Sequence, residues 1–304
     1  MENLFLVALA GFMAAMVDGA LGMGFGPTSS TLLLSAGIPP AAVSTTVNLA
    51  KVVSGLAAGV SHWRFRNIDH RLVLQLAIPG CLGALIGVAI LTRVDGDTLR
   101  PLLALMLLLV GLRMLLRFSK PLPVALPGPA DAADGPPKFD ESGVKVVAAA
   151  GGVTNGLVGA WGPVVTPFLL HKGLPPRFAI GSVNTAEVAV ATVAATSLIA
   201  SLGRGSLDIG VILAMMAGGV LAAPLAAWVI RFIPARAMGL AVAALLLVTN
   251  VRELATWADI NVVRWAFYGA SIALVTVAAL APRMRTAWVA RRSVGFSVSP
   301  LQAD

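Results

Sequence analysis

The sequence predicts an all-α polytopic membrane protein made of two inverted repeats, each a broken helical hairpin followed by three spans, plus one extra C-terminal span. Composition is the first observation: 58% of the 304 residues are hydrophobic and only 12% are charged, whereas about a quarter of a soluble domain is charged. Several apolar stretches reach the roughly 20 residues that a helix needs to cross a bilayer. The other two observations are a duplicated glycine-rich break and the distribution of basic residues.

The break interrupts an apolar segment twice, and from its Gly-Pro onward the copies align without a gap at an offset of 136 residues. The first copy contains Gly26-Pro27 and the turn 37–40, and the second contains Gly162-Pro163 and the turn 173–176. A fixed period of this size indicates a duplicated half-protein. In lipid, irregular backbone is tolerated only where it lines a cavity inside the protein.

The elements follow in the same order in both halves. In the first half we expect a helix over 4–21, a break from Gly22 to Pro27, a short arm over 28–36, and spans over 41–61, 72–92 and 99–117. In the second half we expect a helix over 144–158, a break from Gly159 to Pro163, an arm over 164–171, spans over 177–201, 208–230 and 236–251, and an extra span over 262–281. The domains are the first repeat (1–118), a Pro-rich cytoplasmic linker (119–142), the second repeat (143–252), and the extra span with a basic tail (253–304).

Lysine and arginine predict the orientation. If each broken segment is a hairpin that enters and leaves the membrane on one side, most of the 22 basic residues share one side of the chain. The positive-inside rule makes that side the cytoplasm. It also puts the equivalent loops 62–71 and 203–207 on opposite sides, which predicts inverted repeats. Inverted repeats with discontinuous helices are a transporter architecture, with the substrate site near the midplane where the repeats meet. The two hairpin tips should therefore approach each other.

Each tip has the features of an anion site. A proline suits the first turn of the short helix after the break, and the free N–H groups and positive dipole end of that helix would face the cavity. The alternative is that the glycines only permit close helix packing. The predicted substrate-binding residues at the tips are Gly22, Gly24, Gly26, Thr28, Ser29, Gly159, Trp161 and Gly162.

Ionisable residues inside the spans are the other candidates. Lys51 and Glu187 occupy equivalent positions in the two copies, and a charged residue in a span is a functional hypothesis by default. Near a two-fold axis the two can face each other; the alternatives are a purely structural pair, or a Lys51 that snorkels to the surface. Lys51 would attract an anion. Glu187 and Asp18, which ends the first helix, are candidate proton carriers; Asp18 can instead bond the backbone N–H groups of the break.

Polar residues follow the first turn of the span after each hairpin. Asn48 and Asn184 belong to a polar stripe on these helices. They are predicted to contact substrate, and the equal alternative is that they join helices by hydrogen bonds.

Other chemistry is not expected. The three histidines show no metal-ligand spacing, the single cysteine supports neither a disulfide framework nor a thiolate site, and the glycine motifs lack the ending of a phosphate loop. We expect no enzyme activity, no cofactor, no metal and no nucleic acid. The expected partners are a small-molecule anion, protons and the lipid bilayer of a bacterial plasma (inner) membrane, and a homodimer is the oligomeric state to test.

These residues resemble the TauE/SafE family, the sulfite exporter-like group of membrane proteins. The resemblance rests on the turns 22–27 and 37–40, the loop ending 66–69, the small residues 80–87, and their second-half counterparts 159–163, 173–176 and 204–208. It implies export of a sulfur-containing anion such as sulfite or an organosulfonate. The second turn departs from the family pattern because it reads Ala160-Trp161-Gly162. Trp161 is therefore expected to narrow or reshape the substrate pocket.

The sequence thus predicts a proton-coupled secondary transporter, an exporter of such an anion. Two alternatives stay open. One is a passive anion channel on the same scaffold, and the other is a membrane assembly or sensing subunit that transports nothing itself.

Overall fold

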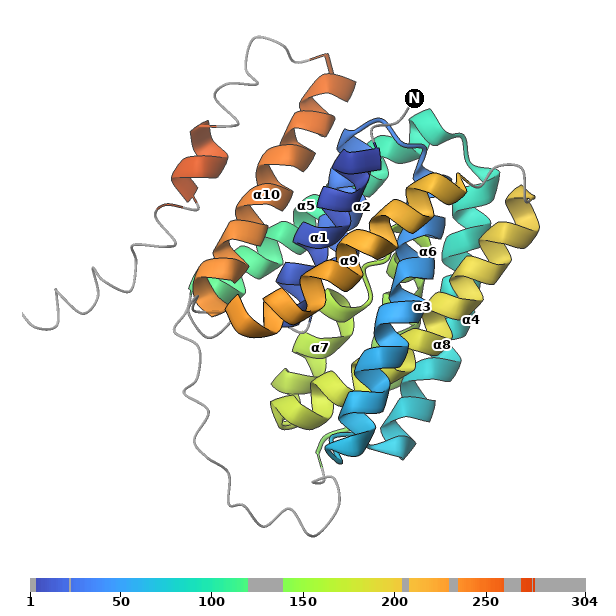
Figure 1. The fold of residues 1–304 in the computed structure, drawn as a ribbon, viewed down its shortest axis with the longest axis vertical. Helices are drawn as coiled ribbons and strands as arrows, with labels where there is room; N and C mark the ends of the chain where they lie inside the picture. Colours follow the sequence, from blue (N-terminus) through green and yellow to red (C-terminus); the bar gives the residue numbers. More distant parts are fainter. Residues whose placement is uncertain are drawn as a thin grey trace, which may run out of the picture.

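The computed structural model describes residues 4–21, 23–119, 139–203, 208–229, 235–259, 269–274 and 276, and the regular structure over these residues is helical (Figure 1). The first half contributes α1 (Leu4–Leu21), α2 (Phe25–Ser35), α3 (Pro40–Arg64), α4 (His70–Arg93) and α5 (Gly96–Ser119). The second half contributes α6 (Val144–Val158), α7 (Gly162–His171), α8 (Pro176–Leu202), α9 (Ile209–Val229) and α10 (Ala235–Trp257).

The predicted all-helical fold is confirmed. Five of the described helices are long and apolar enough to cross a membrane, namely α3, α4, α5, α8 and α10. Shorter apolar stretches lie in α1, α6 and α9. Most of the predicted linker and most of the predicted span over 262–281 lie outside the described residues.

Both breaks are shorter than predicted. We expected the first break to run to Pro27 and the second to Pro163, but α2 begins at Phe25 and α7 at Gly162. Each proline therefore lies in the first turn of its helix, where its missing N–H breaks no helical hydrogen bond. The remaining turns depend on glycine, because Gly24 has a φ of 139° and Gly159 a φ of 67°.

Helices of one half pack against helices of the other in a two-fold pattern. α4 packs on α6, and their counterparts α9 and α1 pack on each other. The pairs α3 with α8 and α5 with α10 join equivalent helices (Figure 1). A two-fold relation between the halves produces this set of pairs.

The direction of these pairs can be followed from neighbouring residues. Along α3, Gly55 lies against Val188 and Gly59, one turn later, lies near Thr185, which precedes Val188. α3 and α8 are therefore antiparallel. α5 and α10 are antiparallel too, because Gly111 lies against Leu246 while Phe118, further along α5, lies against Gly239.

Equivalent helices that pack antiparallel are what two inverted halves would give. The orientation of the halves in a bilayer stays a prediction. Within the protein, the arrangement brings the two breaks together between α3 and α8.

Candidate functional site

The two hairpin tips touch. A Cβ atom built on Gly26, in the first turn of α2, would lie 1.8 Å from the carbonyl oxygen of Gly159, which ends α6. A real Cβ never comes so close to an oxygen, so only glycine allows this contact. The predicted approach of the tips is thus seen in the structure.

Lys51 lies at this junction and is buried, with 5% of its surface exposed. Its Nζ donates to the carbonyl oxygen of Gly159 over 2.6 Å and to Oδ1 of Asn155 over 3.4 Å. It also forms an ion pair with Glu187, whose side chain is 17% exposed. The side chain therefore turns toward the second tip, which excludes the alternative that Lys51 snorkels to the surface.

The second tip is held by side chains of the first half. Asn48 donates to the carbonyl oxygen of Asn155 over 3.2 Å, and Asn155 donates back to Oδ1 of Asn48 over 2.7 Å. Ser44 donates to the carbonyl oxygen of Gly156, and Ser30 to that of Val158, each over 2.7 Å. The two serines thereby satisfy the carbonyl groups of Gly156 and Val158, which lack a donor within α6.

The first tip is held differently, although the chain is duplicated. Asp18 aligns with Asn155, but its carboxylate accepts from the backbone N–H of Phe25 over 3.2 Å and so caps the start of α2. Thr166 aligns with Ser30, yet its hydroxyl is buried without a hydrogen-bond partner. Asn184 aligns with Asn48 but is only half-buried. No hydrogen bond joins Asn184 to Asp18 among the described residues.

The remaining predicted residues fall into distinct environments. Thr28 is buried and its hydroxyl has no hydrogen-bond partner, whereas the hydroxyl of Ser29 bonds the backbone of its own helix. Gly24 and Gly162 flank the tips as expected, and Gly22 lies outside the described residues. A binding role for any of them stays a prediction.

Trp161 is fully buried in the second half. Its indole N–H donates to the carbonyl oxygen of Val183 over 3.1 Å, and its ring packs where Gly80 and Gly151 leave room. The equivalent residue in the first half is Phe25, which lies against Gly219.

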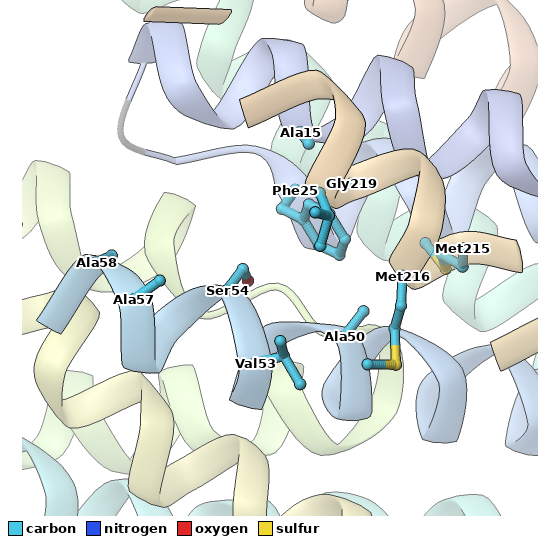
Figure 2. A pocket seen from close by; sticks show the side chains of 11 residues that line it. Ala15, Phe25, Ala50, Val53, Ser54, Ala57, Ala58, Met215, Met216 and Gly219 are labelled. Atoms are coloured by element: carbon cyan, nitrogen blue, oxygen red, sulfur yellow. The ribbon is translucent and has the colours of Figure 1, made fainter. Parts of the chain in front are cut away.

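The smaller ring of Phe25 adjoins a cavity of about 410 Å³ between α1, α3 and α9 (Figure 2). The walls are apolar except for Ser54, and Ala50 and Ser54 stand on either side of Lys51 along α3. In Figure 2 the ring of Phe25 lies between α9 and α3, beside Gly219. Met215 and Met216 lie one turn earlier on α9. The cavity therefore adjoins the first-half position that corresponds to Trp161.

Among the described residues, no three His, Cys, Asp or Glu side chains gather where a metal could bind. Asn155 is the main site residue that was not among the predicted ones. Its alignment with Asp18 was the available signal, because a polar residue at the end of both broken helices marks the tip.

The family model described as Sulfite exporter TauE/SafE matches residues 7–252. The chain belongs to this family. The TauE/SafE model spans both hairpins and the helices α3–α5 and α8–α10, apart from the ends of α1 and α10, so the whole tip junction lies inside the match.

Two relatives carry transporter names. The chain is 40% identical over 258 residues to the "Probable membrane transporter protein YtnM" of Bacillus subtilis (strain 168), covering 84% of this chain and 83% of that protein. It is 30% identical over 104 residues to the "Probable membrane transporter protein ORF9" of a Sinorhizobium species, covering 34% of this chain and 40% of that protein. No solved structure matches the chain. This TauE/SafE protein is therefore a multi-pass membrane transporter.

Proposed function

We propose that the protein exports a small sulfur-containing anion, an organosulfonate or sulfite, and that a proton binds together with the anion. The observation that carries the proposal is the buried ammonium of Lys51 at the contact of the two tips. All three of its partners carry negative or partial negative charge: the Gly159 carbonyl, the Asn155 amide oxygen and the Glu187 carboxylate. An anion bound to Lys51 would take the place of one of them.

Charge favours Glu187 as the group that is displaced. With Lys51, Glu187 and Asp18 all ionised, the junction carries one net negative charge and repels an anion. A proton on Glu187 ends the ion pair and frees Lys51, so the anion and the proton would bind together. Asp18 is the other candidate proton carrier, and its carboxylate accepts from the N–H of Phe25.

The apolar cavity supports an organic anion in particular. A Cβ atom built on Gly26 would lie 3.1 Å from Nζ of Lys51, and Phe25, the residue before Gly26, forms a wall of the cavity. A sulfonate bound at Lys51 could thus extend its carbon chain into apolar space. Its volume of about 410 Å³ lies within the range of small-molecule sites, and sulfite alone would leave most of it empty.

The proposed direction and location follow from the comparisons. Export is the activity that the family description names, and the two relatives come from bacteria. We therefore place the protein in a bacterial plasma membrane, with the anion leaving the cytoplasm.

The test is flux from proteoliposomes loaded with a two-carbon alkyl sulfonate, which stays fully ionised across the pH range used. We expect efflux to rise when the interior is made more acidic than the exterior, because the proton and the anion leave together. Efflux that ignores the pH difference points to a passive channel. If neither the sulfonate nor sulfite moves while the protein is folded, the protein is an assembly or sensing subunit and the proposal is wrong.

Substitution of Phe25 by tryptophan tests the role of the cavity. The larger ring should fill the first-half space as Trp161 fills its counterpart. We expect the KM for the two-carbon sulfonate to rise about tenfold. Apolar contact with one methylene group of a substrate is worth roughly 10–200-fold in kcat/KM, and the larger ring would remove such contact. The KM for sulfite should change less than about twofold. Val146→Trp, which adds the same bulk to a residue that is 73% exposed on α6, is the control, and equal effects on both anions would contradict a role for the cavity.

A further inference from the structure

Arg117 is a half-buried guanidinium near the end of α5 that lies against the first hairpin tip. Its Nη1 is 3.7 Å from the sulfur of Met23, the residue before Gly24. Met23 is itself buried, with 4% of its surface exposed. The guanidinium is thus turned inward onto the tip instead of outward to the membrane surface.

Among the described residues, Arg117 has few hydrogen-bond acceptors. A guanidinium carries five N–H donors, and a thioether sulfur is a weak acceptor. Besides Met23, its contact is with the ring of its neighbour Phe118. In the described part of the chain, the carboxylates that form ion pairs do so with Lys51, Arg71 and Lys172, and none does so with Arg117. The half-buried guanidinium of Arg117 therefore has N–H groups that can donate to an oxyanion.

Met23 separates Arg117 from the second tip. A Cβ atom built on Gly162, the first residue of α7, would lie 3.2 Å from Cβ of Met23. The guanidinium, the thioether and the start of α7 therefore follow one another from α5 toward the junction at Lys51. The distribution of basic residues predicts that this end of α5 is on the cytoplasmic side.

We propose that Arg117 binds the transported oxyanion on the cytoplasmic approach, before the anion passes Met23 and reaches Lys51. The forked N–H groups of arginine match two oxygens of a sulfonate or sulfite group. This inference rests on the proposed function, because it needs an oxyanion that moves through the junction. It adds a second cationic site to the one at Lys51.

The chain offers a matched control one helical turn away. Arg113 is exposed on the same helix, so its loss removes an equal charge without removing the contact with the tip. Arg117→Gln should raise the KM for sulfonate supplied at the cytoplasmic face about tenfold, because a charge-assisted, two-pronged hydrogen bond is lost. The maximal flux should change less than about twofold. Arg113→Gln should leave the KM within about twofold, and Arg117→Lys should recover part of the loss because it keeps the charge but not the fork.

Two further arms separate the proposal from other roles of Arg117. Met23→Leu keeps the side-chain volume but removes the sulfur, so a merely structural role through Met23 would raise the KM in this variant as well; we expect no change beyond about twofold.

A lipid phosphate is another oxyanion that could bind here. The KM shift of Arg117→Gln should be equal in vesicles with and without anionic lipid, and a shift confined to anionic vesicles would identify the lipid as the ligand and overturn the proposal.

Failure of this inference is distinguishable from failure of the proposed function. If the native protein moves the sulfonate but Arg117→Gln behaves like Arg113→Gln, only the role of Arg117 is wrong. If the native protein moves neither anion, the proposed function is wrong and the inference falls with it.

Discussion

Lys51→Met should abolish sulfonate flux and destabilise the protein by about 3–5 kcal/mol, the usual cost of removing one partner of a buried ion pair. Methionine keeps the length of the side chain but not the charge. Glu187 would then be left unpaired between α3 and α8, and the Gly159 carbonyl would lose its donor. Thermal unfolding in detergent and flux in proteoliposomes measure the two effects.

The double variant Lys51→Met/Glu187→Leu separates stability from transport. Replacing both members of a buried pair by apolar residues is often neutral or better, so the double variant should recover much of the lost stability. It should still move no anion, because the cation that binds the anion is gone. A double variant that regains flux along with stability would show that the pair is purely structural.

Gly26→Ala should be about as damaging, by a different route. The added methyl group would lie 1.8 Å from the Gly159 carbonyl oxygen and 3.1 Å from Nζ of Lys51. The oxygen belongs to backbone and cannot rotate away, so the two tips would have to separate. We expect a loss of about 3 kcal/mol or more, at the upper end of what overpacking costs, and a loss of flux.

Gly59→Ala is the control for this substitution. Gly59 lies in the interior of α3, and the nearest atom to an added Cβ is 3.9 Å away. Alanine favours a helix interior over glycine by about 1 kcal/mol, so the control should be slightly more stable than the native protein and retain flux. A Gly26→Ala protein with native stability and flux would show that contact of the tips is not required.

The pairing of Lys51 with Glu187 could be anticipated from the sequence for a definite reason. Residues at equivalent positions of a duplicated chain meet wherever a two-fold axis passes between their helices, and this axis passes between α3 and α8. The bounds of the breaks were harder to predict from the sequence, because a proline such as Pro27 or Pro163 is tolerated in the first turn of a helix as well as in a turn between helices.

Asn48 and Asn184 show where the duplication misleads. Their equal positions gave them equal predicted roles, but Asn48 bonds the second tip through Asn155 while Asn184 is half-buried. The difference comes from the partner position: Asn155 offers an amide that both donates and accepts, whereas Asp18 is an acceptor occupied by the N–H of Phe25. The sequence of one half alone therefore does not predict which of the two asparagines bonds the opposite tip.

Arg117 was not recognisable as a site residue either. In the sequence it is one of several basic residues near a predicted cytoplasmic end, and the positive-inside rule accounts for all of them alike. Which of them turns toward Met23 depends on how α5 packs against α2 and α10.

The most direct test of the account is the binding of a two-carbon alkyl sulfonate to the purified protein by calorimetry, at a series of pH values, with the native protein and Glu187→Gln. The account predicts that native affinity rises as the pH falls, by at most tenfold per pH unit, because one proton is bound together with the anion. Glutamine imitates the protonated carboxyl, so Glu187→Gln should bind at least as tightly as the native protein at its lowest pH, with little dependence on pH. Native binding that does not strengthen on acidification, or a Glu187→Gln protein that binds no sulfonate, would contradict the claim that protonation of Glu187 frees Lys51 for the anion.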